Sequence, residues 1–183
     1  MTSPVTERLL LRPFCEADRA PFAALNSHPL VVESLGSSPT RAESDAMVER
    51  FALELEREGW GLWAVEVVGG ESFVGMVGLH RVNPALPCAP AVEAAWRIHP
   101  AQWGHGYATE AAAAALRHGF SVGGLEEIVA FTTTLNQRSQ SVMRRIGMVR
   151  DPAGSFDHPS VAVGSPLRRH VLYRSQAVHR VVA

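Results

Sequence analysis

Residues 103–111 read Trp-Gly-His-Gly-Tyr-Ala-Thr-Glu-Ala, and this stretch decides the fold. Gly104, Gly106 and Ala108 follow an expected strand and open an expected helix, where small residues let the backbone turn tightly and approach a ligand closely. A helix start offers unpaired N–H groups and a partial positive charge. The pattern therefore predicts an anion site suited to a phosphate or pyrophosphate. Two glycines alone are equally consistent with such an anion site and with a simple strand-to-helix turn that binds no ligand.

Two other kinds of glycine-rich phosphate site do not match this stretch. A dinucleotide-binding fingerprint would have a third glycine at Thr109 and an early place in a βαβ unit. A Walker loop needs a lysine, and all 17 basic residues of the chain are arginine. The absence of lysine also excludes a Schiff-base mechanism. Nucleotide binding at this turn is therefore disfavoured.

Strands and helices alternate on both sides of the turn. The helix after it covers 107–120, with its apolar residues on one stripe, and the strand before it covers 92–98. Thr40 and Glu43 form a capping-box pattern that starts another helix. The other expected elements are a strand at 9–11, a helix at 16–25, a hairpin at 62–68 and 72–79, a strand at 127–134, a helix capped by Asn136, a loop at 151–167 and a last strand at 170–173. This order predicts a mixed α/β sheet.

Length and composition limit the class of protein. The chain has 183 residues, 46% of them hydrophobic, which suits one folded domain. A net charge of -1 gives no reason to expect a nucleic-acid or anionic-membrane partner. No apolar run approaches the roughly 18–20 residues of a membrane span, and the N-terminus has no signal-peptide core, so we expect a cytoplasmic protein with Cys15 and Cys88 reduced. Neither the cysteines nor the 8 histidines have metal-ligand spacing, so no metal is expected.

The stretch 103–111 closely resembles the acyl-CoA pyrophosphate loop of the GNAT superfamily of N-acetyltransferases. Three further segments resemble the same family in order, namely the opening 6–13, the strand 93–98 and the segment 136–148. Most of the family has glutamine or arginine at the first loop position, where this chain has Trp103. That tryptophan and the opening are typical of the Rim-type branch, the ribosomal-protein N-terminal acetyltransferases and their relatives.

The resemblance implies one GNAT domain over residues 1–183. Its α/β (α+β) fold has a mixed, mostly antiparallel central sheet flanked by helices, and acyl-CoA binds where two central strands splay. In the family the loop amides bind the pyrophosphate, the strand before the loop holds the pantetheine arm and polarises the thioester, and an asparagine contacts that arm. Carried to this sequence, the residues that bind acetyl-CoA are Trp96, Arg97, Ile98, Trp103, Gly104, His105, Gly106, Tyr107, Ala108, Thr109, Asn136 and Ser139.

The reaction that the resemblance implies is attack of a primary amine on the acetyl thioester in a ternary complex. It needs a group that takes the amine proton and a donor to the departing sulfur. Glu93 is the candidate general base, acting through a water. The alternatives are a solvent-facing role for Glu93, another carboxylate such as Glu33, or an amine that arrives neutral. Ser139 is the candidate donor to the thiolate, or a helix cap, because the tyrosine that many family members carry on this helix is Met143 here.

The acceptor is expected to be a primary amine, either a protein N-terminus or a small molecule, with neither nucleic acid nor membrane as a partner. The loop that contains 157–159, Asp-His-Pro, is expected to shape the acceptor pocket or a subunit contact, which leaves a homodimer open. Trp60 and Trp63 are expected in the core or in a pocket wall. The alternative class is a catalytically silent acyl-CoA-binding module. Met143 keeps that class open, because methionine cannot donate a proton.

Overall fold

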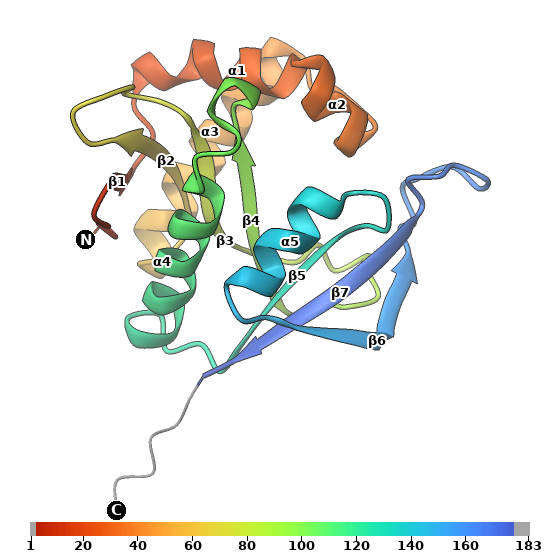
Figure 1. Ribbon diagram of the computed structural model, residues 1–183. Coiled ribbons are helices and arrows are strands. Elements are labelled where there is room, and N and C mark those ends of the chain that lie inside the picture. Colours follow the sequence, from red (N-terminus) through yellow and green to blue (C-terminus); the bar gives the residue numbers. More distant parts are fainter. Residues whose placement is uncertain (1–2, 178–183) are drawn as a thin grey trace, which may run out of the picture.

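The computed structural model describes residues 3–177, which form one seven-stranded open sheet with helices on both faces (Figure 1). The strands lie in the order β1-β2-β3-β4-β5-β7-β6, and all neighbours are antiparallel except β4 and β5. They are β1 (Leu9–Arg12), β2 (Leu62–Val67), β3 (Gly75–Arg81), β4 (Val92–Ile98), β5 (Glu127–Thr133), β6 (Val149–Asp157) and β7 (Arg169–Gln176). The helices are α1 (Arg19–Ser27), α2 (Pro29–Leu35), α3 (Arg41–Glu58), α4 (Tyr107–Ser121) and α5 (Gln137–Arg145). The expected mixed, mostly antiparallel α/β sheet is therefore confirmed, and no helix within these residues is long and apolar enough to cross a membrane.

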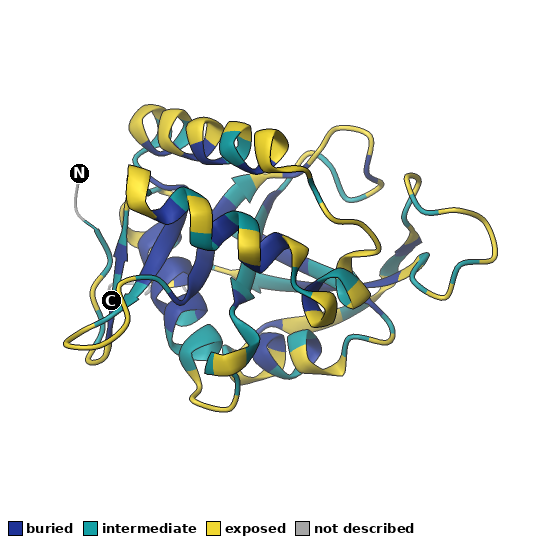
Figure 2. Cartoon of the chain, turned by 90° about the horizontal axis from the view of Figure 1, so that it is seen from above, coloured by how far each residue is buried: buried dark blue, intermediate teal, exposed yellow. Residues whose placement is uncertain are grey.

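Helices cover the two faces of the sheet in separate groups, with α4 and α5 on one face and α1 and α3 on the other (Figure 1). Figure 2 shows that the helices are buried along the sides that face the sheet and exposed on their outer sides. Side chains alternate between the two faces along each strand. On β4, Ala94 and Ile98 belong to the core under α4, whereas Ala95 packs with the core under α1 and α3. Even-numbered residues of β4 therefore face α4, and odd-numbered residues face α1.

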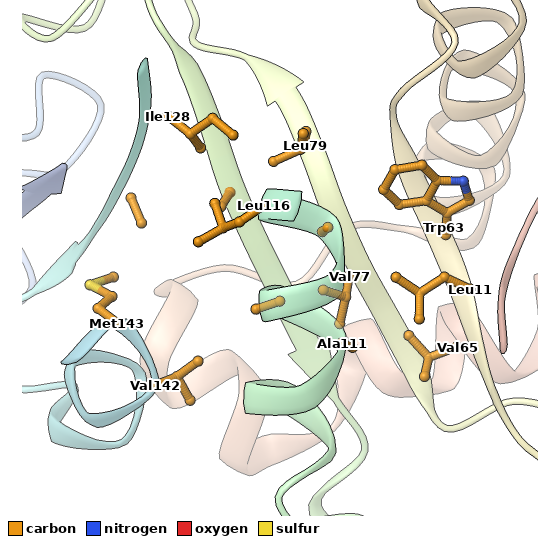
Figure 3. Close-up of a cluster of buried hydrophobic side chains, with 14 of the residues drawn as sticks. Leu11, Trp63, Val65, Val77, Leu79, Ala111, Leu116, Ile128, Val142 and Met143 are labelled. Carbon is orange, nitrogen blue, oxygen red and sulfur yellow. The ribbon is translucent and has the colours of Figure 1, made fainter. Parts of the chain in front are cut away.

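The core under α4 depends on small residues that let the helix lie close to the sheet (Figure 3). Ala111 has no exposed surface, and a Cβ added at Gly119 would lie 2.5 Å from the Cδ1 atom of Leu79. Gly119 is thus a packing residue inside α4. Trp60 and Trp63 are 4% and 1% exposed in the same cluster, so they are core residues.

The parallel pair β4 and β5 is joined only at Glu93 and Val129. Along its other edge β4 pairs with β3 throughout, and the flanking bond from the His99 N–H to the Val74 carbonyl shows that odd-numbered residues bond to β3. Even-numbered residues of β4 therefore direct their N–H and C=O groups toward β5. Beyond Glu93 the two strands separate, and a gap opens between them that widens toward the start of α4 (Figure 1).

Two elements lie outside the expected ones, α2 and β6. Helix α2 has ordinary end signals, a proline at its first turn and Gly36 with φ 75° after its end, but its seven residues are too short to show a helical period. The predicted loop at 151–167 is wrong in its first part, because β6 runs to Asp157 and pairs with β7 around a bulge between Asp151 and Phe156. The connecting loop is the shorter segment 158–168.

Candidate active site

The turn before α4 has a backbone conformation that favours glycine. Gly104 has φ 87° and Gly106 has φ 82°, both in the left-handed region. Gly106 is the N-cap of α4, and no side chain caps this helix start. Among residues 3–177, no acceptor receives a hydrogen bond from the backbone N–H groups of 104–109. The turn therefore presents a row of unpaired N–H groups at the positive end of the α4 dipole.

Trp103 ties this turn to the end of β4. Its indole Nε1–H donates to the Ile98 carbonyl at 2.8 Å. The Arg138 guanidinium of α5 lies 4.4 Å from the centroid of the Trp103 ring, in a cation–π contact. The sequence assigns this position only a backbone role, and the structure adds a side chain that joins the turn to both β4 and α5.

A clamp formed by Thr6, Arg8 and Glu110 holds the turn from the other side. The Glu110 carboxylate accepts hydrogen bonds from the Thr6 hydroxyl at 2.6 Å and from Arg8 Nε at 2.8 Å. Arg8 Nη1 also donates to the carbonyl of His105, within the turn, at 3.1 Å. Sequence reasoning missed this clamp. The sequence held one signal for the clamp, because the opening at 6–13 and the stretch that contains Glu110 both resemble the same family.

Replacing Glu110 by Gln should weaken CoA binding by roughly two- to fivefold, as expected for a largely solvated ion pair. Burial raises the pKa of Glu110, but hydrogen bonds from Thr6 and Arg8 outweigh it, so the pKa is lowered from 4.5. The stabilisation by the clamp is therefore complete above pH 4.5 and is lost as the pH falls further. Thermal unfolding of wild type and Glu110→Gln across pH should show a difference that shrinks on acidification. A constant difference would contradict the role of the charge.

Peptide groups without strand partners line the gap between β4 and β5. Trp96 has an even number on β4, so its N–H and C=O point toward β5 in the part where the strands have separated. On β5 the even-numbered residues bond to β7, as the bond from the Thr134 N–H to the Arg169 carbonyl at 2.9 Å shows. Phe131 therefore directs its N–H and C=O toward β4, a contribution that the sequence did not reveal. An extended ligand with amide groups can pair with both edges as a short strand would.

Helix α5 starts directly after β5 and carries two of the predicted polar residues. Asn136 Oδ1 accepts the Ser139 N–H at 3.1 Å and thereby caps the helix. In the described part of the chain, the Asn136 side-chain NH₂ and the Ser139 hydroxyl have no hydrogen-bond partner. Met143 lies one turn further on the same side of α5 and is 1% exposed in the core (Figure 3). Of Ser139 and Met143, only Ser139 can therefore donate a hydrogen bond from this side of α5.

Glu93 lies at the closed end of the gap, where β4 and β5 still pair. Its side chain is 12% exposed, and its Oε2 lies 3.1 Å from Nε2 of His80, the directly opposite residue on β3. His80 Nδ1 donates to the Arg81 carbonyl at 3.1 Å, so Nε2 donates to Glu93 when the imidazole is protonated. Burial by itself lowers the pKa of His80, but the hydrogen bond and negative charge of Glu93 outweigh it, and the pKa is raised. His80 thus holds the Glu93 carboxylate in one orientation.

The predicted site residues lie on two faces of the sheet. The turn at 103–109 lies beside α4 and α5, with Asn136 and Ser139. Glu93 and Arg97 have odd numbers on β4 and direct their side chains to the opposite face, under α1. The Arg97 side chain therefore points away from the turn, while its backbone remains next to the gap. The alternative carboxylate, Glu33, is exposed on α2.

Comparisons with known proteins identify the family and the fold of the chain. The family described as "Acetyltransferase (GNAT) domain" matches residues 8–149. FsC-acetyl coenzyme A-N(2)-transacetylase of Aspergillus fumigatus is 31% identical over an alignment of 180 residues, and the match covers 93% of this chain and 76% of that protein. The crystal structure of a GNAT-family acetyltransferase from Bacillus anthracis has a TM-score of 0.78 at 25% identity and covers 96% of this chain and 99% of its own. The ribosomal alpha-N-protein acetyltransferase RimL, in complex with coenzyme A, shares the fold with a TM-score of 0.71 at 17% identity, over 94% of this chain and 96% of its own.

Proposed function

The chain belongs to the GNAT acetyltransferase family and is an N-acetyltransferase, and on this basis we propose that it transfers an acetyl group from acetyl-CoA directly to a primary amine. The observation that carries the proposal is the row of unpaired N–H groups at 104–109, which leads into the gap between β4 and β5. These two features fit the two parts of acyl-CoA, an anionic pyrophosphate and an extended arm with amide groups.

In the proposed complex, the pyrophosphate binds at the start of α4 and the pantetheine arm runs along the gap. The peptide groups of Trp96 and Phe131 pair with the arm from its two sides. From Ile98 to Glu93 the gap edge is about 16 Å long at the usual rise of a strand, which accommodates an extended arm. The thioester carbonyl then lies at the Trp96 N–H, three residues along β4 from Glu93, and the Asn136 side chain reaches the arm from α5.

The proposed reaction is a single acyl transfer. The amine nitrogen attacks the thioester carbonyl carbon, a C–N bond forms, and the C–S bond breaks with the electron pair leaving on sulfur. The amine proton passes through a water to the Glu93 carboxylate. The Trp96 N–H donates to the oxygen that becomes negative in the transition state. The Ser139 hydroxyl donates a hydrogen bond to the departing sulfur. The thiolate then takes up a proton from solvent and Glu93 releases its proton to solvent, so the products are the acetylated amine and free CoA.

We further infer an acceptor that is a protein N-terminus or a small amine, and a place in the Rim-type branch. The opening at 6–13 and Trp103 support the branch. We also infer that the whole chain works as one domain, because a single sheet includes both β1 and β7.

Release of free thiol from acetyl-CoA, measured with a panel of primary amines and peptides, tests the proposed function. An enzyme of this kind should release thiol only when a suitable amine is present, and mass spectrometry should find the acetylated amine. CoA binding is measured separately by calorimetry. Tight CoA binding without turnover across a broad panel would favour the catalytically silent module.

Substituting Gly106 by Val should weaken CoA binding by roughly tenfold or more while the domain stays folded. A β-branched residue at φ 82° is strained by about 1–3 kcal/mol, and relief of that strain reorients the N–H groups. The fold should tolerate the change, because a Cβ at Gly106 would have only Arg8 Nη2 nearby, at 3.6 Å. The matched control is Gly69→Val in the β2–β3 turn, where φ is 72° and the described chain places no atom within 4 Å of the new Cβ. Equal CoA affinities for the two variants would count against the assigned site.

A further inference from the structure

Arg97 of β4 carries a charge that no carboxylate in the described part of the chain neutralises. Its Nη1 donates to Oδ1 of Asn26 in α1, and no carboxylate pairs with it among residues 3–177. Burial without a compensating charge lowers the pKa of Arg97 to about 10, so the side chain is still protonated at neutral pH. Other partly buried arginines of the chain differ in this respect; Arg12, for example, binds two carboxylates.

The single partner of Arg97 is held in a fixed orientation. Asn26 is fully buried, and its Nδ2 donates to the Ser44 hydroxyl of α3 at 2.9 Å. Its Oδ1 is therefore turned toward Arg97. A guanidinium has donors on all three of its nitrogens, and only Nη1 has a protein acceptor in the described chain. Arg97 is partly buried as a residue, and its other two nitrogens have no acceptor in the described chain.

Arg97 lies on the same face of the sheet as the proposed base. Glu93 and Arg97 are four residues apart on one strand, which places them roughly 13 Å from each other along β4. Between them on this face is Ala95, which is partly exposed. Its short side chain leaves the strand surface low between a carboxylate and a guanidinium. The face is opposite to α4, so a second substrate can lie there while acyl-CoA occupies the turn and the gap.

Two imidazoles lie at the Arg97 end of this surface. The rings of His28, between α1 and α2, and His99, after β4, have centroids 5.5 Å apart. The Nδ1 atoms of both rings accept backbone N–H groups, from Leu30 at 3.3 Å and from Ala101 at 3.2 Å. The neutral rings therefore carry their protons on Nε2, and this end of the surface is rich in donors.

We propose that Arg97 binds an oxyanion, a carboxylate or a phosphate, on the acceptor itself, so that the enzyme selects amines with an anionic group roughly 10 Å from the nitrogen. The inference rests on the proposed function, because it assumes that the amine is acetylated beside Glu93. Charge-assisted hydrogen bonds from the guanidinium recognise the anion, and the low surface over Ala95 accommodates the segment between the two ends.

The test compares acceptors that differ only in this charge. Glycine oligomers of increasing length are offered with acetyl-CoA as free acids and as C-terminal amides, and kcat/KM is measured by thiol release. The free acid should be preferred by about tenfold or more, and most strongly at the length that spans the two groups. A second arm compares aminoalkyl phosphates with the corresponding amino alcohols. If the aminoalkyl phosphates were preferred over the amino alcohols but the free acids were not preferred over the amides, the oxyanion would be a phosphate.

Variants assign the preference to Arg97. Arg97→Gln keeps a donor for Asn26 but removes the charge, so the ratio of kcat/KM for the acids to kcat/KM for the amides should fall to about one. Arg97→Lys should retain a preference. The control Arg50→Gln removes an exposed charge on α3 and should leave the ratio unchanged. Equal use of acids and amides by the wild type would overturn the inference while leaving the proposed function intact. Absence of turnover with every amine would instead overturn the proposed function, and the inference with it.

Discussion

Glu93→Gln is expected to lower kcat for amine acetylation by roughly a hundred- to ten-thousand-fold, the range found for loss of a general base. Glutamine still accepts a hydrogen bond from His80 across the β3–β4 pair, so the local structure should persist. It cannot take up the amine proton, because an amide is not basic at neutral pH. Steady-state kinetics at saturating acetyl-CoA should show the loss in kcat. Calorimetry should give an unchanged Kd for CoA, since Glu93 points to the face opposite the turn.

The matched control is Glu33→Gln. Glu33 is the other carboxylate considered as a base, and it is exposed on α2. Its replacement should leave kcat within about twofold, as is usual for a surface substitution. If Glu33→Gln were the inactive variant and Glu93→Gln kept most of its activity, the base would have to be reassigned. If both variants remained active, the amine would arrive already neutral.

Arg12→Met is expected to lower the free energy of unfolding by about 3–5 kcal/mol, the cost of leaving a buried charge without its partner. Arg12 donates to both oxygens of Asp18 at 2.6 and 2.9 Å and to Glu66 at 2.7 Å. Asp18 is 2% exposed, so water cannot replace the guanidinium. The contact joins β1 and β2 to the segment that leads into α1, the helix that carries Asn26. Urea denaturation should therefore show a lower midpoint, and acceptor binding should weaken as well.

The pH dependence of this effect has a definite sign. Burial raises the pKa of Asp18, but hydrogen bonds from Arg12 and Cys15 outweigh it and lower the pKa from 3.8. The stabilisation is therefore complete above pH 3.8 and is lost as the pH falls further, so the two proteins should become similar in acid. Arg41→Met is the control, because its ion pair with Asp45 is exposed and should contribute less than about 1 kcal/mol. Equal losses in the two variants would contradict the importance of burial.

Local backbone chemistry explains what could be predicted from the sequence. Gly104 and Gly106 occupy left-handed conformations at the start of α4, where the glycine pattern predicted a tight turn. Thr40 and Glu43 make both hydrogen bonds of the predicted capping box. The strands of the 62–68 and 72–79 hairpin pair as expected, with β3 starting a few residues later. These features depend on residues close together in the chain, and their signals are therefore present in the sequence.

Short or irregular elements gave weaker signals. Helix α2 has seven residues, too few for a period, and β6 contains Pro152 and Gly154 beside its bulge, residues that otherwise indicate a loop. The pairing with β7 decides that β6 is a strand. A proline and a glycine are tolerated there because β6 is the edge strand, with one side of its backbone unpaired in the sheet.

The sequence by itself determined the fold, the family and the turn that is suited to a pyrophosphate, because each follows from a contiguous motif. Only the tertiary structure decided how distant segments meet. Arg8 and Glu110 are 102 residues apart and Asn26 and Arg97 are 71 apart, and nothing local in either segment indicates its partner. Sheet register and strand alternation place Glu93 and Arg97 together on the face opposite the turn. A strand motif specifies which residues alternate, but the packing of α1 and α4 against the sheet specifies which substrate each face can meet.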